Sequence, residues 1–187
     1  MKNLLIKTAN WKFIIPAFLC CVYCIYEFQQ AQAEMSQIAG TSVTTIDVME
    51  DYTLKDVNDL FGKLKAEGRA IHRHNSLVPD MIFPVSYGIL FTLICVWFLI
   101  KITHPKSNWL YLALVPVVLI LLDFKENVNT INLLDSYPNL TAEMVNSASR
   151  ITKIKTDLVG LTMLLPVILG LIWVVKWGVS KLGKSTL

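Results

Sequence analysis

The residues best suited to chemistry lie in one polar stretch that follows an apolar run. One helix face would collect four polar side chains, those of Asp123, Glu126, Asn127 and Thr130. Their spacing of i, i+3, i+4 and i+7 places them above one another on an α-helix. The apolar run before them covers only residues 109–122. At about 1.5 Å per residue, Asp123 lies about 21 Å from its start, inside a hydrocarbon core of about 30 Å. A charge at this depth is costly unless it is paired or hydrated, which indicates an inward-facing structural or functional site.

Charged side chains on two other segments are possible partners. They are Arg150, Lys153 and Asp157 before the last apolar run, and Arg69, His72, Arg73 and His74 before the second. One interpretation is structural: Asp123 and Glu126 pair with Lys153 and Arg69 and fix helix packing. Another is a pocket for a ligand or lipid headgroup, and a third is catalysis with Asp123 or Glu126 as general base. The residues expected to line such a pocket are Arg69, Asp80, Asp123, Glu126, Asn127 and Lys153.

A metal site is a weaker interpretation of the same region. His72 and His74, together with Asp80, Asp123 and Glu126, supply imidazole and carboxylate ligands suited to zinc. However, His72 and His74 are two residues apart and do not share a helix face. The chain also lacks an H-E-x-x-H motif. We therefore predict neither a metal nor another cofactor.

Four apolar stretches must position these residues. They cover about residues 11–30, 81–101, 109–128 and 158–176 of a chain of 187 residues that is 54% hydrophobic. Each stretch approaches the roughly 20 residues that a helix needs to cross a bilayer. Lipid leaves only helices or closed barrels as spanning structures. The predicted fold is all-α, a four-transmembrane-helix bundle that forms a single integral membrane domain over residues 1–187.

Charge predicts the orientation of this bundle. Eight lysines fall on one side without any acid: Lys2, Lys7, Lys12, Lys101, Lys106, Lys176, Lys181 and Lys184. The other side receives all fourteen acids and the remaining Lys and Arg. Because cytoplasmic loops are enriched in Lys and Arg, both termini are expected in the cytoplasm. The loops at 34–79 and 130–150 are then external.

The first external loop contains an amphipathic pattern at residues 51–74. Apolar side chains recur on one helix face, at Val57, Leu60, Phe61, Leu64 and Ile71. Thr53 and Asp56 are spaced as a capping box, whereas Gly62 and Gly68 weaken the helix. We expect an external amphipathic helix between the first two spans, lying on the outer surface or capping the bundle.

The four cysteines and the N-terminal segment each allow another interpretation. Cys21 and Cys24 match C-x-x-C, but Cys20 and Cys95 also lie in predicted spans and the external loops offer no second pair. We therefore interpret all four as small hydrophobic residues and expect no disulfide. Lysines followed by an apolar run and by residues 31–33 (Ala-Gln-Ala) imitate a cleavable secretory signal. We prefer an uncleaved first helix.

From about residue 51 onward the chain resembles a group of small four-span bacterial membrane proteins. The likeness rests on Gly68 and Arg69, Asp80 with Phe83 and Pro84, Asp123 with Glu126 and Asn127, Tyr137 and Pro138, and Lys153 or Lys155. The resemblance implies a bacterial inner-membrane protein and implies no activity. The chain departs from the pattern at His72, where the group has Tyr, which counts against a metal role for this histidine. Residues 69–75 also resemble a stretch of glutathione-utilising four-helix membrane enzymes, but there the stretch is cytoplasmic and here the charge pattern puts it outside.

Three functional hypotheses remain. The leading one is a binding or interaction protein whose polar pocket in the outer leaflet holds a lipid headgroup or a partner's segment. The second is an enzyme acting on a lipid or lipid-linked substrate, and the third is an assembly subunit whose buried charges only fix helix packing. Membrane lipid is the expected partner, with a protein partner or a second copy as further candidates. Nucleic acid is not expected, because no basic patch is interleaved with exposed aromatic residues.

Overall fold

The computed structural model describes residues 2–104 and 107–182, which are largely helical and contain no strand. This confirms the all-α prediction. The elements are α1 (Lys2–Thr8), α2 (Trp11–Ala39), α3 (Leu54–Leu77), α4 (Pro79–Ile102), the 3₁₀ helix η1 (Asn108–Leu114), α5 (Val115–Ser136) and α6 (Ala142–Leu182). Lys106 and Lys184, part of the predicted cytoplasmic set, lie outside the described residues.

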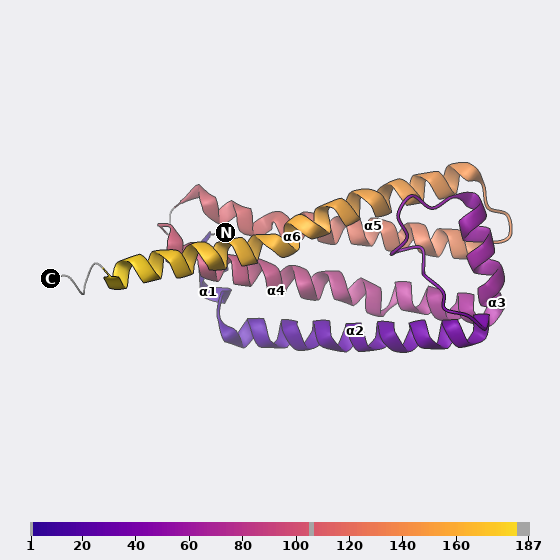
Figure 1. The fold of residues 1–187 in the computed structure, drawn as a ribbon, viewed down its shortest axis with the longest axis horizontal. Coiled ribbons are helices and arrows are strands. Elements are labelled where there is room, and N and C mark those ends of the chain that lie inside the picture. The colour runs from indigo at the N-terminus through magenta and orange to yellow at the C-terminus, as the bar shows by residue number, and fades with distance from the viewer. Residues whose placement is uncertain (1, 105–106, 183–187) are drawn as a thin grey trace.

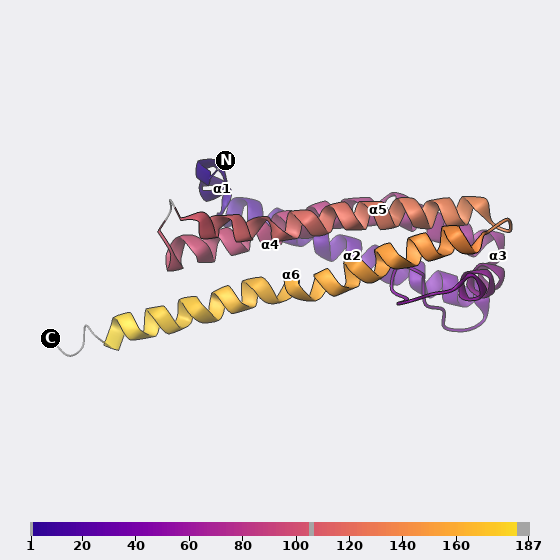
Figure 2. The ribbon, with the colours of Figure 1, turned by 90° about the horizontal axis from the view of Figure 1, so that it is seen from above.

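Four helical segments of the described chain are long and apolar enough to cross a membrane. They are Trp11–Ala39, Leu54–Ile102 (α3 with α4), Asn108–Ser136 and Ala142–Lys181. The helices α2, α4, α5 and α6 run along the long axis of the molecule, while α3 crosses one end of them and α1 lies at the other (Figure 1). Two views agree that α6 runs obliquely to α5 (Figure 2).

The helices extend further than the apolar runs that predicted them. The segment 130–150, predicted as a loop, is helical except at residues 137–141. The helix α6 has 41 residues. At about 1.5 Å per residue this is roughly 60 Å, about twice the thickness of a hydrocarbon core. An apolar run marks only the part of a helix that lipid would cover, whereas backbone hydrogen bonds continue the helix into polar sequence.

Local sequence explains where α3 begins and why it bends. The Thr53 N–H donates to Asp56 at 2.8 Å and the Asp56 N–H donates to the Thr53 hydroxyl at 3.4 Å, which confirms the predicted capping box. The helix is interrupted at Lys65, which has a φ of 55°. This residue lies between Gly62 and Gly68, the two glycines that weaken the helix. Lys65 therefore carries backbone strain that a glycine would not.

The buried face of α3 closes one end of the bundle. Val57, Leu60, Phe61 and Leu64 are buried against α2, α5 and α6, and Ile71 is partly buried beside them. The surrounding core residues include Met35, Ile46, Leu133, Leu134 and Val145. The helix and the loop before it thus form a cap over the ends of the long helices.

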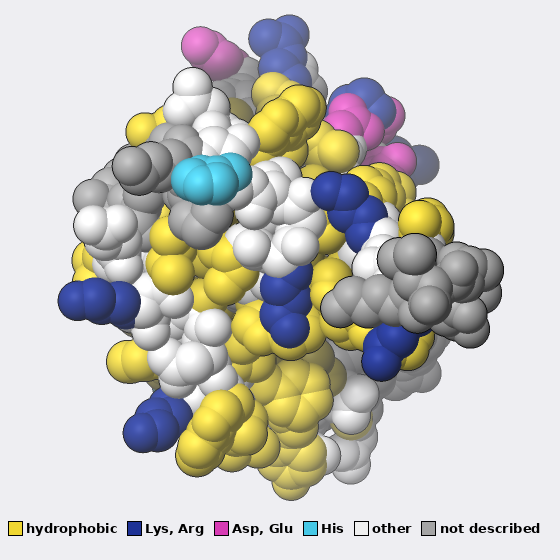
Figure 3. Space-filling view, turned by 90° about the vertical axis from the view of Figure 1, so that its left-hand side faces the viewer, with side chains coloured by type: hydrophobic (Ala, Val, Ile, Leu, Met, Phe, Trp, Pro, Cys, Tyr) yellow, Lys and Arg dark blue, Asp and Glu magenta, His cyan; other side chains and the backbone are white. Residues whose placement is uncertain are grey.

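Lysines gather at the opposite end, where α1 lies and α6 ends. Described members of the predicted cytoplasmic set lie in or near the end turns of helices there: Lys7, Lys12, Lys101, Lys176 and Lys181. Figure 3 shows this end face with Lys and Arg side chains among apolar ones, and with acidic side chains only at its margin. The Lys176 ammonium donates to the Ile102 carbonyl at 2.7 Å and so joins the ends of α6 and α4.

Candidate functional site

Lys155 of α6 is the centre of a buried charged cluster near the capped end. Its ammonium donates to Glu126 Oε2 and lies 3.8 Å from Asp123 Oδ1. It also donates to the backbone carbonyl of Asp47 at 3.2 Å. The side chains of Lys155 and Glu126 are only 14% and 3% exposed. One lysine therefore connects α6, α5 and the loop before α3.

The polar face of α5 points inward, as its spacing predicts. Asp123, Glu126, Asn127 and Thr130 are all buried. The Tyr87 hydroxyl donates to Asp123 Oδ2, and Asn127 Nδ2 donates to the Asp80 carbonyl at 2.5 Å. Both contacts bind α5 to α4. They hold the Asp123 carboxylate against α4 and the Asp80 backbone against α5.

Several buried polar atoms around this cluster lack a hydrogen-bond partner in the described part of the chain. They are Asp47 Oδ1 and both ring nitrogens of His72. Buried polar groups are normally satisfied, and an exception calls for a water, an ion or a ligand. Burial also raises the pKa of the nearby Tyr52 phenol to about 12, with a further contribution from Glu126. Tyr52 thus stays a neutral donor at physiological pH.

A largely apolar groove leads to this cluster. It has a volume of about 740 Å³ and lies between α2, α4 and α6. Its apolar walls include Ile14, Phe18, Val22, Phe83, Leu90, Phe91, Val159 and Met163. Its polar residues include Asp47, Asp80, Tyr87, Asp123, Lys155 and Thr162. The volume falls within the range typical of small-molecule sites, about 300–1,000 Å³.

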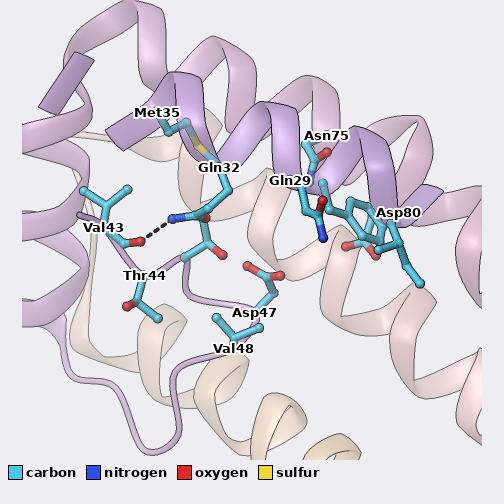
Figure 4. A pocket seen from close by; sticks show the side chains of 12 residues that line it. Gln29, Gln32, Met35, Val43, Thr44, Asp47, Val48, Asn75 and Asp80 are labelled. Carbon is cyan, nitrogen blue, oxygen red and sulfur yellow. Dashed lines mark hydrogen bonds between the residues drawn. The ribbon is translucent and has the colours of Figure 1, made fainter. Parts of the chain in front are cut away.

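A second pocket of about 430 Å³ lies between α2 and the loop before α3. Figure 4 shows Gln29 and Gln32 on one wall and the loop on the other, with Gln32 donating to the Val43 carbonyl. Asp47 and Asp80 line both this pocket and the apolar groove. The two carboxylates therefore lie where a pocket with the more polar lining meets the apolar groove.

Four of the six predicted pocket residues come together, namely Asp80, Asp123, Glu126 and Asn127. The other two lie elsewhere. Arg69 donates to the Phe61 carbonyl at 2.8 Å and stacks on Tyr137, with 4.6 Å from its guanidinium carbon to the ring centre. Lys153 lies 3.5 Å from the exposed carboxylate of Asp51.

The predicted pairing of Asp123 and Glu126 with Lys153 and Arg69 is corrected to a pairing with Lys155. Residues two apart on a helix point about 200° apart, so Lys153 and Lys155 cannot lie on the same face of α6. Tyr87 and Asp47 were also missed. Tyr87 follows Asp80 by seven residues, which places both on one face and could have identified it. Asp47 lies in irregular chain, where no periodicity exists to place it.

The histidines do not form a metal centre with these acids. Within residues 2–104 and 107–182, no three His, Cys, Asp or Glu side chains lie close enough to hold a metal ion. The His72 ring packs edge-on against Phe61, with 6.4 Å between ring centres, while His74 is exposed at the end of α3. The cysteines of the described chain are free thiols.

These features define a class: an all-helical protein with four described segments apolar enough to cross a membrane and a charged cluster buried at one end. The chain matches no protein-family model, no curated protein and no solved structure.

Proposed function

We propose that the protein is a multi-pass membrane protein that binds an amphiphilic molecule such as a membrane lipid. The observation that carries this proposal is the groove between α2, α4 and α6, whose apolar walls end at Asp47, Asp80, Asp123 and Lys155. Such a shape matches a molecule with an apolar chain and a polar headgroup. The chain would lie along the groove and the headgroup would contact the charged cluster.

The open side of the groove supports entry from a bilayer. On α2, Ile15, Phe18 and Val22 line the groove and are about half exposed, at 49%, 52% and 47%. Apolar surface of this kind is unfavourable in water and favourable against lipid chains. A lipid can therefore enter sideways without crossing water.

The proposed orientation places the lysine-rich end in the cytoplasm of a bacterium and the cap formed by α3 outside its inner membrane. It is supported by the gathering of lysines at one end and by the rule that cytoplasmic segments carry them. Single cysteines at Asp51 and Lys181, in a variant without the native cysteines, test it in intact cells. Labelling by an impermeant maleimide at position 51 alone supports the orientation, and labelling at position 181 alone reverses it.

Native mass spectrometry of the protein in mild detergent tests lipid binding. Val159→Trp places a large side chain in the groove. Val167→Trp on the same helix is the control, because Val167 is exposed and lines none of the cavities described. We expect a stoichiometric lipid adduct on the native protein and on Val167→Trp, and its loss from Val159→Trp. Equal adducts on both variants would place the lipid elsewhere and refute the proposal.

A purely structural role is the second candidate, and the contacts of Lys155 favour it. They join three segments and fix the rotation of α5 against α6. The same spectra separate the two functions, because a structural role leaves the native protein without an adduct. They also report the mass of any second copy or protein partner.

A further inference from the structure

We infer that the headgroup bound at this site carries a cationic ammonium group, held between Asp47 and Asp80. This inference rests on the proposed amphiphile binding and names the chemical class of the ligand. It comes from the charge balance of the cluster, from the chemistry of the pocket behind it and from the buried Asp47 oxygen that has no partner within the described residues.

The cluster has more negative than positive groups. It contains four carboxylates, those of Asp47, Asp80, Asp123 and Glu126, and one ammonium, that of Lys155. The neighbouring Lys and Arg side chains are engaged elsewhere: Lys153 with Asp51, Arg73 with Asp135, and Arg69 with the Phe61 carbonyl and the Tyr137 ring. Buried carboxylates without a counterion are costly, so a cationic ligand would be favoured.

Asp47 and Asp80 are the two carboxylates of the cluster with which Lys155 forms no ion pair. Lys155 reaches only the backbone of Asp47, and within the described residues neither acid forms an ion pair. Asp47 Oδ1 is buried and has no hydrogen-bond partner. Figure 4 shows the Asp47 carboxylate pointing from the loop into the pocket, towards Gln29 and Asp80. An ammonium has three donors and could satisfy both carboxylates at once.

The pocket behind these acids also disfavours an anionic headgroup. Its polar lining beyond Asp47 and Asp80 consists of neutral amides and hydroxyls, from Gln29, Gln32, Thr44, Thr45 and Asn75, without any Lys or Arg. A phosphate or carboxylate would therefore enter a site of like charge with no cation in the pocket. Neutral amides accept hydrogen bonds from a small cationic group and add no further charge.

Three single-chain probes of equal length test the inference: dodecylamine, dodecan-1-ol and dodecanoic acid. Their dissociation constants are measured on the purified full-length protein by native mass spectrometry. We expect dodecylamine to bind at least about tenfold more tightly than the alcohol, and the acid to bind most weakly. Equal binding of the three would overturn the inference and leave amphiphile binding intact. No binding by any of them would refute amphiphile binding itself.

Charge-removing variants locate the ammonium. Asp80→Asn and Asp47→Asn should reduce the preference for the amine over the alcohol towards unity, because each keeps the shape of the site. Asp51→Asn is the control, since Asp51 is an exposed acid of the same loop that lines neither cavity. If Asp80→Asn fails to fold, the binding preference of the loop variant Asp47→Asn is the test. A preference unchanged in Asp47→Asn would overturn the inference.

Natural sources of an ammonium are then separated by a second set of probes. Phosphatidylethanolamine carries an ammonium beside a phosphate, whereas a long-chain amine carries it alone. Binding of phosphatidylethanolamine in preference to phosphatidylglycerol identifies a phospholipid ligand, with the ammonium again dependent on Asp47. Binding of the amine with exclusion of both phospholipids identifies a long-chain amine.

Discussion

Replacement of Lys155 by Met removes the one cation of the buried cluster and gives a sharp test of its energetics. The ammonium contacts Glu126, Asp123 and the Asp47 carbonyl, so all three groups lose a cationic partner together, while Asp123 keeps the hydrogen bond from Tyr87. Breaking a buried ion pair by removing one side costs about 3–5 kcal/mol, because the other charge stays buried. Two carboxylates are left unpaired here, which places Lys155→Met at the upper end of that range.

Removing the charge of Glu126 is expected to cost less stability than removing that of Lys155. Glu126→Gln keeps an oxygen that can accept from Lys155, and the ammonium retains Asp123 at 3.8 Å. We expect a cost near the lower end of about 3–5 kcal/mol for this variant. The double variant should lose less than the sum of the two single changes, since residues in one contact couple by about 0.5–3 kcal/mol.

The assay is equilibrium unfolding in detergent micelles, followed by circular dichroism. The pair of Arg73 and Asp135 is the control, because its Nε–Oδ1 distance of 2.7 Å is short while its side chains are 44% and 50% exposed. Water and salt screen such a pair, so Arg73→Met should cost far less than Lys155→Met. If the two variants lose equal free energy of unfolding, water reaches the cluster and burial does not strengthen its ion pairs.

Two further predictions concern the backbone, and thermal unfolding in detergent checks both. Lys65→Gly should stabilise the protein by about 1 kcal/mol, because it relieves the strained backbone at φ 55°. Lys63→Gly, at an unstrained helical position two residues earlier, should destabilise the protein by about 1 kcal/mol. A loss of stability in both variants would argue against strain at Lys65. Gly88→Ala should cost about 1–3 kcal/mol, because the added methyl would overlap a side chain of α5. Gly160→Ala meets nothing within 4 Å, so a similar loss there would show that packing against α5 is not the cause.

The local features of the fold could be predicted from the sequence because they depend on neighbouring residues. The capping box at Thr53 and Asp56 needs only side chains three residues apart. The inward polar face of Asp123, Glu126 and Asn127 follows from helical periodicity. The ends of α5 and α6 could not be predicted in this way, because polar sequence beyond an apolar run continues a helix only where packing supports it.

The composition of the site depended on contacts that no local pattern specifies. The sequence offers both Lys153 and Lys155, and the choice between them depends on the rotation of α6 about its axis. Asp47 reaches the cluster because a loop without periodicity folds back over α2. The groove and its polar end exist only where three helices diverge, so they could not be predicted from any one of them.

The sequence by itself determined that four apolar helical segments form and that one of them carries a buried polar face. Those properties follow from chain geometry, which repeats every 3.6 residues whatever the surroundings. Only the tertiary structure decided that Lys155 pairs with this face, that Asp47 and Asp80 form no ion pair within the described residues, and that an apolar groove ends beside them. These are relations between segments up to about one hundred residues apart, as for Lys155 and Asp47. Such relations are set by packing across the whole bundle and not by spacing along the chain.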